Sequence, residues 1–138
     1  QLGLQTTNPV QSDLVRVVKE RTDGAGADIV FEVSGSAAGA QVMTDLVRTR
    51  GRIVVVAIFA QAPPVDLFRI FWRELDLVGT RVYEPQDFEQ AIQLAAEGTL
   101  PLEQIISARR TLSELQMTFE DIESNTELMK VLVDTRKG

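Results

Sequence analysis

The sequence has 138 residues, enough for one domain with its own core, and its hydrophobic fraction of 44% is ordinary for a globular protein. The formal net charge of −6 and the shortness of the longest apolar run, residues 53–60, argue against nucleic acid and membranes as partners, and we expect a cytoplasmic protein. The chain has no cysteine and no histidine, which excludes disulfides, thiolate zinc sites, cysteine proteases and Ser-His-Asp hydrolases.

The first part of the chain predicts a helix, a loop and a buried strand. Asn8 followed by Pro9 is typical of a helix start, so we expect a helix that begins there. The glycine-rich residues 22–27 precede a strand and do not follow one, which is the wrong place for a phosphate-binding loop. Residues 27–33, ADIVFEV, form a short apolar run of the kind found in buried parallel strands.

A second helix and a second strand follow this run. The small residues 34–36 end the first strand, and an apolar side chain at every fourth residue from Ala38 to Leu46 predicts a helix that ends near Gly51. Residues 52–59, RIVVVAIF, again read as a buried parallel strand. Strands that alternate with helices predict a mostly parallel sheet with helices on both faces.

The pattern continues over the next forty or so residues and then changes. Residues 65–75 predict an amphipathic helix with aromatic side chains in the core, and residues 76–83, DLVGTRVY, predict a third strand. Pro85 opens a further helix that ends before Gly98. We therefore divide the chain into residues 1–98 and 99–138, because the part after Gly98 lacks a long regular pattern.

Two local signals lie in the last part. Thr111 and Glu114 have the spacing of a capping box ahead of an apolar helical repeat, and residues 129–134, MKVLVD, predict a last short strand.

The residues that could carry chemistry are few. Most carboxylates occupy positions on a helix surface, so we expect no catalytic residue and no metal ligand in this chain. What remains are the ends of the three strands, at residues 33–36, 57–59 and 80–82. Parallel pairing brings strand ends to one edge of a sheet, which is where open α/β sheets bind ligands.

Five blocks occur in an order that carries a family resemblance: GADIVFEVSGS, LVRTRGRIVVVAIF, LFRIFWRELDLVGTRVY, DFEQAIQLAAEGTLPLEQIIS and LMKVLV. Together they resemble the carboxyl-terminal part of the zinc-containing medium-chain alcohol dehydrogenases, in the sorbitol, threonine and butanediol dehydrogenase branch. The resemblance implies an α/β fold, an incomplete doubly wound (Rossmann) parallel sheet that lacks its first strands and its phosphate loop. Residues 1–98 are then the second half of an NAD(P)-binding domain, and residues 99–138 return toward a catalytic domain that this chain does not contain.

The resemblance also implies an activity for the intact parent. That protein would be a zinc-dependent oxidoreductase that moves hydride between NAD or NADP and a secondary alcohol or polyol. Zinc would belong to the parent only, because this chain lacks the ligands, and the fragment alone would be inactive. Two alternatives stay open: a zinc-free reductase of the same superfamily, such as a quinone reductase, and a non-catalytic domain that associates with itself. Metal ligands upstream would separate the first alternative from the dehydrogenase, and a cofactor titration would separate the second.

Site residues follow from the same resemblance. In the family, the loop after the strand that matches residues 27–33 lies against the adenine and ribose of the cofactor. The end of the next strand contacts the nicotinamide ribose, and the end of the third strand lies near the carboxamide. A basic residue near the chain end matches an approach to the cofactor's phosphate or ribose. The implied cofactor-binding residues are Val33, Ser34, Gly35, Ser36, Val56, Ala57, Ile58, Thr80, Arg81, Val82 and Lys130.

Two further expectations come from the family pattern. Ala57 and Ala60 stand where the family often has glycine, which narrows the approach to the dinucleotide. The third strand, Leu77 to Tyr83, matches a sheet edge that pairs with its mate in a second subunit, so we expect a homo-oligomer through that edge.

Overall fold

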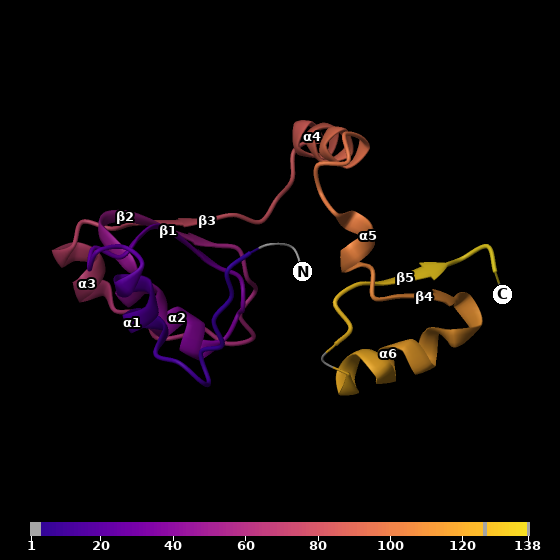
Figure 1. Ribbon diagram of the computed structural model, residues 1–138, viewed down its shortest axis with the longest axis horizontal. Helices are drawn as coiled ribbons and strands as arrows, with labels where there is room; N and C mark the ends of the chain where they lie inside the picture. The colour runs from indigo at the N-terminus through magenta and orange to yellow at the C-terminus, as the bar shows by residue number, and fades with distance from the viewer. Residues whose placement is uncertain (1–3, 126, 138) are drawn as a thin grey trace. The chain divides into compact units, whose positions relative to one another are not determined.

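The computed structural model describes residues 4–125 and 127–137, and these form two compact units (Figure 1). The first unit reaches Val82, and the second begins at Tyr83. The division after Gly98 that the sequence suggests concerns function in a longer protein, and it stays a prediction.

The first unit is built on a parallel sheet of three strands in the order β1-β2-β3. The strands are β1 (Ala27–Glu32), β2 (Val47–Val55) and β3 (Asp76–Gly79). Helix α2 (Ala37–Leu46) connects β1 to β2, and helix α3 (Leu67–Trp72) connects β2 to β3. The strand-helix alternation predicted from the apolar runs is therefore present.

The register aligns the carboxyl ends of the three strands. Glu32 lies opposite Val55, and Val55 lies opposite Gly79. The strands are parallel, so the segments that follow them leave the sheet at one edge, as the sequence predicted. β2 and β3 end earlier than the predicted ends at residues 59 and 83, because the last ladder partner of β2 is Gly79 and pairing stops there.

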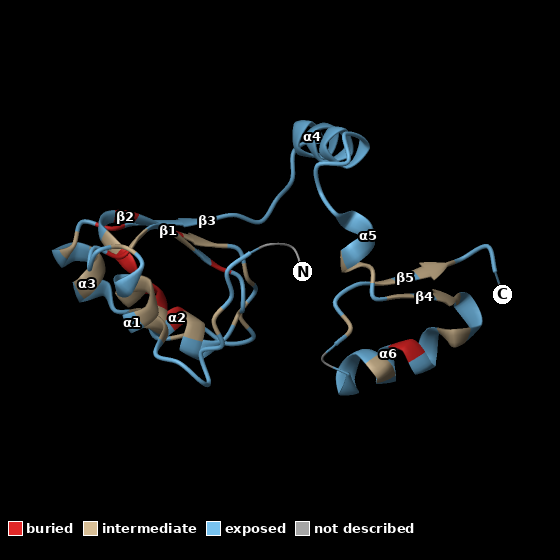
Figure 2. Ribbon diagram, in the orientation of Figure 1, coloured by how far each residue is buried: buried red, intermediate tan, exposed pale blue. Residues whose placement is uncertain are grey.

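The core of this unit lies between the sheet and α2 (Figure 2). Four hydrophobic residues of the core cluster are buried, and four others pack around them. The buried ones are Met43, Val47, Ile53 and Leu75, and the surrounding ones are Val30, Val55, Val65 and Ile70. Because Val30, Ile53 and Val55 share one face of the sheet, that face is the one that the helices cover.

The aromatic residues of α3 do not belong to this core, which corrects the prediction. Phe68, Phe71 and Trp72 are 66%, 75% and 69% exposed, and Phe68 stacks on Trp72 with ring centroids 5.8 Å apart. The helix has only six residues, and its contact with the core comes from Ile70. A helix this short presents one turn to the sheet, so its other side chains face outward.

The first helix also begins later than predicted. α1 spans Leu14–Glu20, and the Asp13 carboxylate caps it by accepting the Arg16 N–H at 3.1 Å. Asn8 accepts the Val10 N–H at 2.9 Å and so forms a turn instead of a helix start. The asparagine side chain competes with helical pairing here, and Val10 is left 91% exposed.

Helix α2 ends at Leu46, not near Gly51 as predicted, and Gly51 lies inside β2. The Arg73 guanidinium donates to the Thr44 carbonyl at 2.7 Å and to the Val47 carbonyl. These carbonyls lie at the carboxyl end of the helix, where such groups have no partner within the helix. A side chain distant in sequence therefore caps the carboxyl end of α2.

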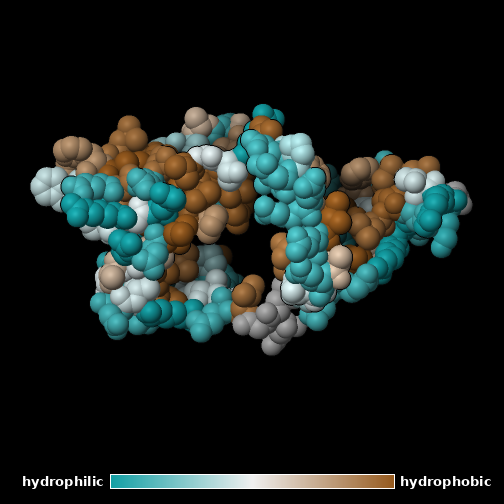
Figure 3. Space-filling model, turned by 90° about the horizontal axis from the view of Figure 1, so that it is seen from above, coloured by the Kyte–Doolittle hydropathy of each residue, from teal (hydrophilic) through white to brown (hydrophobic). Residues whose placement is uncertain are grey.

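The second face of the sheet is open within the described part of the first unit. Phe31, Val54 and Val78 lie in register across the three strands on this face, and Phe31 is 62% exposed. Helices α1 to α3 lie on the other side of the sheet (Figure 1). Viewed from above, hydrophobic side chains gather over this unit (Figure 3). The sequence predicted helices on both faces, and the described helices of this unit cover one.

The second unit pairs two short parallel strands, with Ala108 opposite Val131. The last strand was predicted, whereas the other lies in the stretch without a long regular pattern. No helix in the described ranges is long and apolar enough to cross a membrane. The elements are α4 (Pro85–Ala96), α5 (Leu102–Ile105), β4 (Ala108–Thr111), the 3-10 turn η1 (Leu112–Glu114), α6 (Leu115–Ser124) and β5 (Val131–Asp134).

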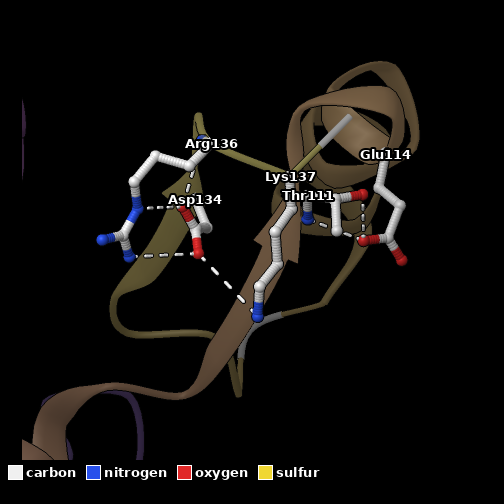
Figure 4. A network of polar contacts seen from close by, with 5 residues as sticks. All are labelled: Thr111, Glu114, Asp134, Arg136 and Lys137. Atoms are coloured by element: carbon white, nitrogen blue, oxygen red, sulfur yellow. Dashed lines mark hydrogen bonds and ion pairs between the residues drawn. The ribbon is translucent and has the colours of Figure 1, made fainter.

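Polar contacts hold the ends of these two strands (Figure 4). The predicted capping box forms, with the Thr111 N–H and hydroxyl donating to Glu114 at 2.7 and 2.8 Å. These bonds lower the pKa of Glu114. Asp134 accepts from the Arg136 side chain at 3.0 Å and its backbone N–H at 3.1 Å, and these bonds lower the pKa of Asp134. The Lys137 ammonium lies 3.9 Å from the same carboxylate.

Candidate functional site

The candidate site is the edge where β1, β2 and β3 end. The residues predicted to bind a cofactor follow these strands directly, as the segments 33–36, 56–58 and 80–82. Lys130 belongs to the second unit, where its carbonyl accepts the Ser107 N–H at 2.8 Å just before β5. The sheet thus brings ten of the eleven predicted residues to one edge, and Lys130 is not among them.

Glu32, the last residue of β1, organises the first segment. Its side chain is buried, with 4% of the residue exposed. The carboxylate accepts the Ser34 N–H at 3.1 Å, the Ser34 hydroxyl at 2.5 Å and the Gly35 N–H at 3.2 Å. No role was predicted for this residue from the sequence. A lone acid in an apolar strand, followed by Ser-Gly-Ser, was the signal that could have identified it.

Two glycines are required by close approach around this carboxylate. Gly35 has a φ of +65°, and a Cβ there would lie 2.7 Å from the Ile58 carbonyl oxygen. A Cβ at Gly39 would lie 2.5 Å from the Glu32 carboxylate and from the Ser34 hydroxyl. The small residues after β1 therefore let the first segment pack against both the second segment and α2.

The same segment begins helix α2. The Ser36 hydroxyl accepts the Gly39 N–H at 2.9 Å, which caps the helix, and it lies 2.9 Å from the Ser34 hydroxyl. A serine at this position is among the preferred N-cap residues. Residues 34–36 thus form a tight turn that caps α2, and the hydroxyl groups of Ser34 and Ser36 lie where β1 ends.

Backbone hydrogen bonds join the three segments. The Glu32 carbonyl accepts the Val56 N–H at 2.9 Å and the Ala57 N–H at 3.1 Å. The Thr80 N–H donates to the Val55 carbonyl at 3.0 Å. The side chains beyond these bonds are open to solvent, and Ile58 is 82% exposed. The edge is therefore a continuous strip with fixed backbone and accessible side chains.

A pocket of about 480 Å³ lies beside the first segment. It is bounded by β1, by α2 and by the amino-terminal end of α1, and its wall includes Ser34 and Ser36. Most of its other lining side chains are apolar, among them Leu14, Val15, Val30, Val33, Val42 and Met43. Asp13 and Glu32 also line the space, and mainly apolar walls with a few polar groups are typical of pockets that bind small ligands.

The opposite end of the sheet carries ion pairs. Glu74 lies 2.5 Å from Arg50, and this hydrogen bond and the opposite charge lower the pKa of Glu74 and raise that of Arg50. The charged groups therefore pair with one another at the end away from the candidate site. The other pairs there are Arg48 with Asp28 at 2.5 Å and Arg52 with Asp76 at 2.9 Å.

The residues present do not fit a zinc ion. The sequence has no histidine and no cysteine. Over the ranges that the structure describes, no group of three or more histidine, cysteine, aspartate or glutamate side chains could hold a metal. Zinc sites in proteins are built mainly from histidine nitrogen and cysteine sulfur ligands. Any zinc chemistry would therefore need ligands from outside these residues.

Comparison with known proteins matches the chain to one family and its members. The zinc-binding dehydrogenase family matches residues 1–97. A 2-dehydro-3-deoxy-L-galactonate 5-dehydrogenase from Pseudoalteromonas atlantica is 46% identical over 134 residues, which is 97% of this chain and 39% of that protein. A sorbitol dehydrogenase from Halalkalibacterium halodurans is 35% identical over 123 residues, 88% of this chain and 35% of that protein. The chain thus spans well under half the length of these relatives.

Solved structures show the same fold. An alcohol dehydrogenase from Thermus sp. ATN1 superposes with a TM-score of 0.87 at 27% identity, covering 96% of this chain and 39% of the other. A dehydrogenase structure from Sinorhizobium meliloti, solved with NADP bound, gives a TM-score of 0.79 at 27% identity, covering 94% and 39%. The predicted fold class, a partial Rossmann-type parallel sheet, is confirmed.

Proposed function

Because this chain belongs to the zinc-binding dehydrogenase family, as its sequence blocks predicted, we propose that it is the cofactor-binding portion of a longer NAD(P)-dependent oxidoreductase. The observation that carries the proposal is the edge at which three parallel strands end together in small, accessible residues. Open α/β sheets bind ligands at such an edge. Residues 1–98 would serve the cofactor domain, and residues 99–138 would return toward a catalytic domain.

The residues at the edge fit a dinucleotide. In this proposal the segment Val33–Ser36 lies against adenine and ribose. The mainly apolar pocket beside it suits the adenine ring, and the hydroxyl groups of Ser34 and Ser36 suit the ribose. Val56, Ala57 and Ile58 take the nicotinamide ribose, and Thr80, Arg81 and Val82 take the carboxamide. Lys130 is included in the proposal, as an approach to the phosphate or ribose, on the family resemblance alone. A bound NAD or NADP supplies the hydride chemistry, and these residues bind and orient it.

The substrate class that we propose is a secondary alcohol within a polyol or a sugar-derived acid. The support is the names of the relatives, which include a dehydrogenase of a deoxygalactonate derivative and a sorbitol dehydrogenase. These names favour an alcohol dehydrogenase over the quinone-reductase alternative. We assign no step to zinc, because the described residues do not fit it.

The test is an assay of the full-length dehydrogenase that carries this chain. We expect reduction of NAD or NADP with a polyol or sugar acid, followed by the absorbance of the reduced nicotinamide, and no reduction of quinones. Calorimetric titration of both cofactors gives the preference between them. A full-length protein that binds neither cofactor would overturn the proposal. The 138-residue chain alone should bind them weakly, since its described residues offer no glycine-rich loop between a strand and a helix to hold the pyrophosphate.

A homo-oligomer that forms through the unpaired lateral side of β3, the outer strand of the sheet, is part of the proposal. β3 pairs with β2 on one side, and its other side has no strand among the described residues of this unit. The Thr80 N–H points to β2, so the Arg81 N–H faces the open side by alternation. The predicted strand Leu77–Tyr83 is shorter, since β3 ends at Gly79. Light scattering should show a dimer or a larger species, and Arg81→Pro should weaken the association because it removes a backbone N–H donor. A protein that is monomeric at every concentration would contradict this prediction.

A further inference from the structure

We propose that Glu32 is a positioning residue, whose buried carboxylate sets the shape of the segment Val33–Ser36 for the cofactor. The inference rests on the proposed function, because it takes this segment as the one that lies against adenine and ribose. Glu32 is also in the wall of the adjoining pocket, and the role proposed for it is to hold the backbone of the segment. It acts through Ser34 and Gly35, whose backbone it holds.

The first argument is the burial of the carboxylate and the identity of its partners. Glu32 is 4% exposed, and a buried carboxylate is costly unless hydrogen bonds satisfy it. All of the hydrogen bonds described for the Glu32 carboxylate come from Ser34 and Gly35, in the segment that follows it. Oε1 accepts the N–H and the hydroxyl of Ser34, and Oε2 accepts the N–H of Gly35. A charge at this place therefore fixes two consecutive backbone groups.

The second argument is the conformation that these bonds hold. Gly35 adopts a φ of +65°, and its Cα lies so close to the second segment that a Cβ would be 2.7 Å from the Ile58 oxygen. The backbone of Glu32 holds that second segment as well, since its carbonyl accepts the Val56 and Ala57 N–H groups. One residue thus ties the two segments that the proposal places against the cofactor.

The third argument is the position of the carboxylate against α2. A Cβ at Gly39 would lie 2.5 Å from Oε1, so the carboxylate lies at the first turn of this ten-residue helix. The amino-terminal end of a helix favours negative charge. Glutamine at residue 32 is neutral and loses this attraction. Its NH₂ group would also face the donors of Ser34 or Gly35, where the carboxylate has an acceptor oxygen.

The experiment uses the full-length dehydrogenase and the cofactor that the wild-type enzyme prefers. Glu32→Gln should raise the KM for the cofactor roughly tenfold, the effect of losing a hydrogen bond to a charged group, and change kcat less than about twofold. Ser34→Ala, at an exposed residue, should raise this KM by roughly threefold. The matched control is Glu74→Gln, at the opposite end of the sheet, which should leave KM and kcat unchanged.

The double variant separates positioning from a merely structural role. If Glu32 acts through Ser34, the two substitutions are coupled, and the double variant raises the KM by less than the product of the two single fold-changes. Independent effects would overturn the proposal, as would a folded Glu32→Gln protein with wild-type KM. If Glu32→Gln does not fold, Ser34→Ala decides, and an unchanged KM overturns the proposal. A wild-type enzyme that binds no cofactor fails at the earlier step and overturns the proposed function itself.

Discussion

The two units differ in how they bury apolar side chains. The first unit encloses Met43, Val47, Ile53 and Leu75, which are between 0% and 8% exposed. In the described part of the second unit the one buried residue is Thr118, while Phe119 is 58% exposed. The first unit is therefore held by a hydrophobic core, and the second by local hydrogen bonds and a two-stranded pairing.

This difference indicates what each unit needs from elsewhere. Helices α4 and α6 have apolar faces with large exposed side chains, and a soluble protein rarely leaves so many of them uncovered. The first unit exposes apolar side chains at the open face of its sheet and at the aromatic residues of α3. The contrast supports the proposed return segment, because a segment of this kind would find its apolar cover on another part of a longer protein.

Removal of a core side chain should give the largest effect. Ile53 is fully buried in the central strand, and Ile53→Ala should lower the free energy of unfolding by about 3 kcal/mol through lost transfer energy and a cavity. Phe119→Ala, at an exposed site of the second unit, should cost much less. Urea unfolding followed by circular dichroism measures both. Equal costs would mean that the two units are buried alike.

Loss of the hydrogen bonds from Arg73 to the carboxyl end of α2 should have the next largest effect on stability. Arg73 donates to the carbonyls of Thr44 and Val47, and both of these residues are buried. Arg73→Met keeps most of the apolar stem and leaves the two carbonyls without this partner, which should cost about 2 kcal/mol. Arg16→Met is the control, because the Arg16 side chain forms an exposed ion pair with Glu20, and its loss should change the stability little. The same unfolding measurement applies, and equal effects would contradict the prediction.

The sequence predicted the parts of the fold that depend on residues close together. The parallel strands were predicted because residues 29–31 and 53–55 are short apolar runs, which are typical of such strands. Their burial was predicted less well, since Phe31 is 62% exposed. The capping box read correctly because Thr111 and Glu114 interact across three positions. The alignment of three strand ends followed from the parallel alternation alone.

The errors arose where distant residues decide. The end of α2 at Leu46 was not predicted, and the carbonyls at that end accept hydrogen bonds from Arg73, which is distant in sequence. The aromatic spacing in α3 fits a core face, but the sheet meets Ile70 instead. The hydrogen bonds of the Glu32 carboxylate were not predicted, because two of its three donors are backbone N–H groups, which a sequence pattern does not show.

The capping box offers a smaller effect in the unit without a core. Thr111 supplies the hydroxyl and N–H that reach Glu114, and Thr111→Ala removes the hydroxyl. The cost should be about 1 kcal/mol, as for other capping residues. Ser113→Ala is the matched control, since that residue belongs to the 3-10 turn and only its hydroxyl contacts Thr111. Thermal unfolding of both variants gives the comparison, and a larger loss for Ser113→Ala would contradict it.

The smallest effect should be the dependence of the same box on pH. Because the bonds from Thr111 lower the pKa of Glu114 in the folded protein, the stability that they give is fully present above the ordinary carboxyl pKa of 4.5. It is lost as the pH falls through the lowered value, where the folded carboxylate takes up its proton. Glu114→Gln should therefore lower Tm near neutral pH, by no more than Thr111→Ala does, and the difference from wild type should shrink below about pH 4. Asp134 also has a lowered pKa but titrates in both proteins, so the subtraction removes it. A Tm difference that stayed constant from neutral to acid pH would show that the Glu114 charge contributes nothing to the box.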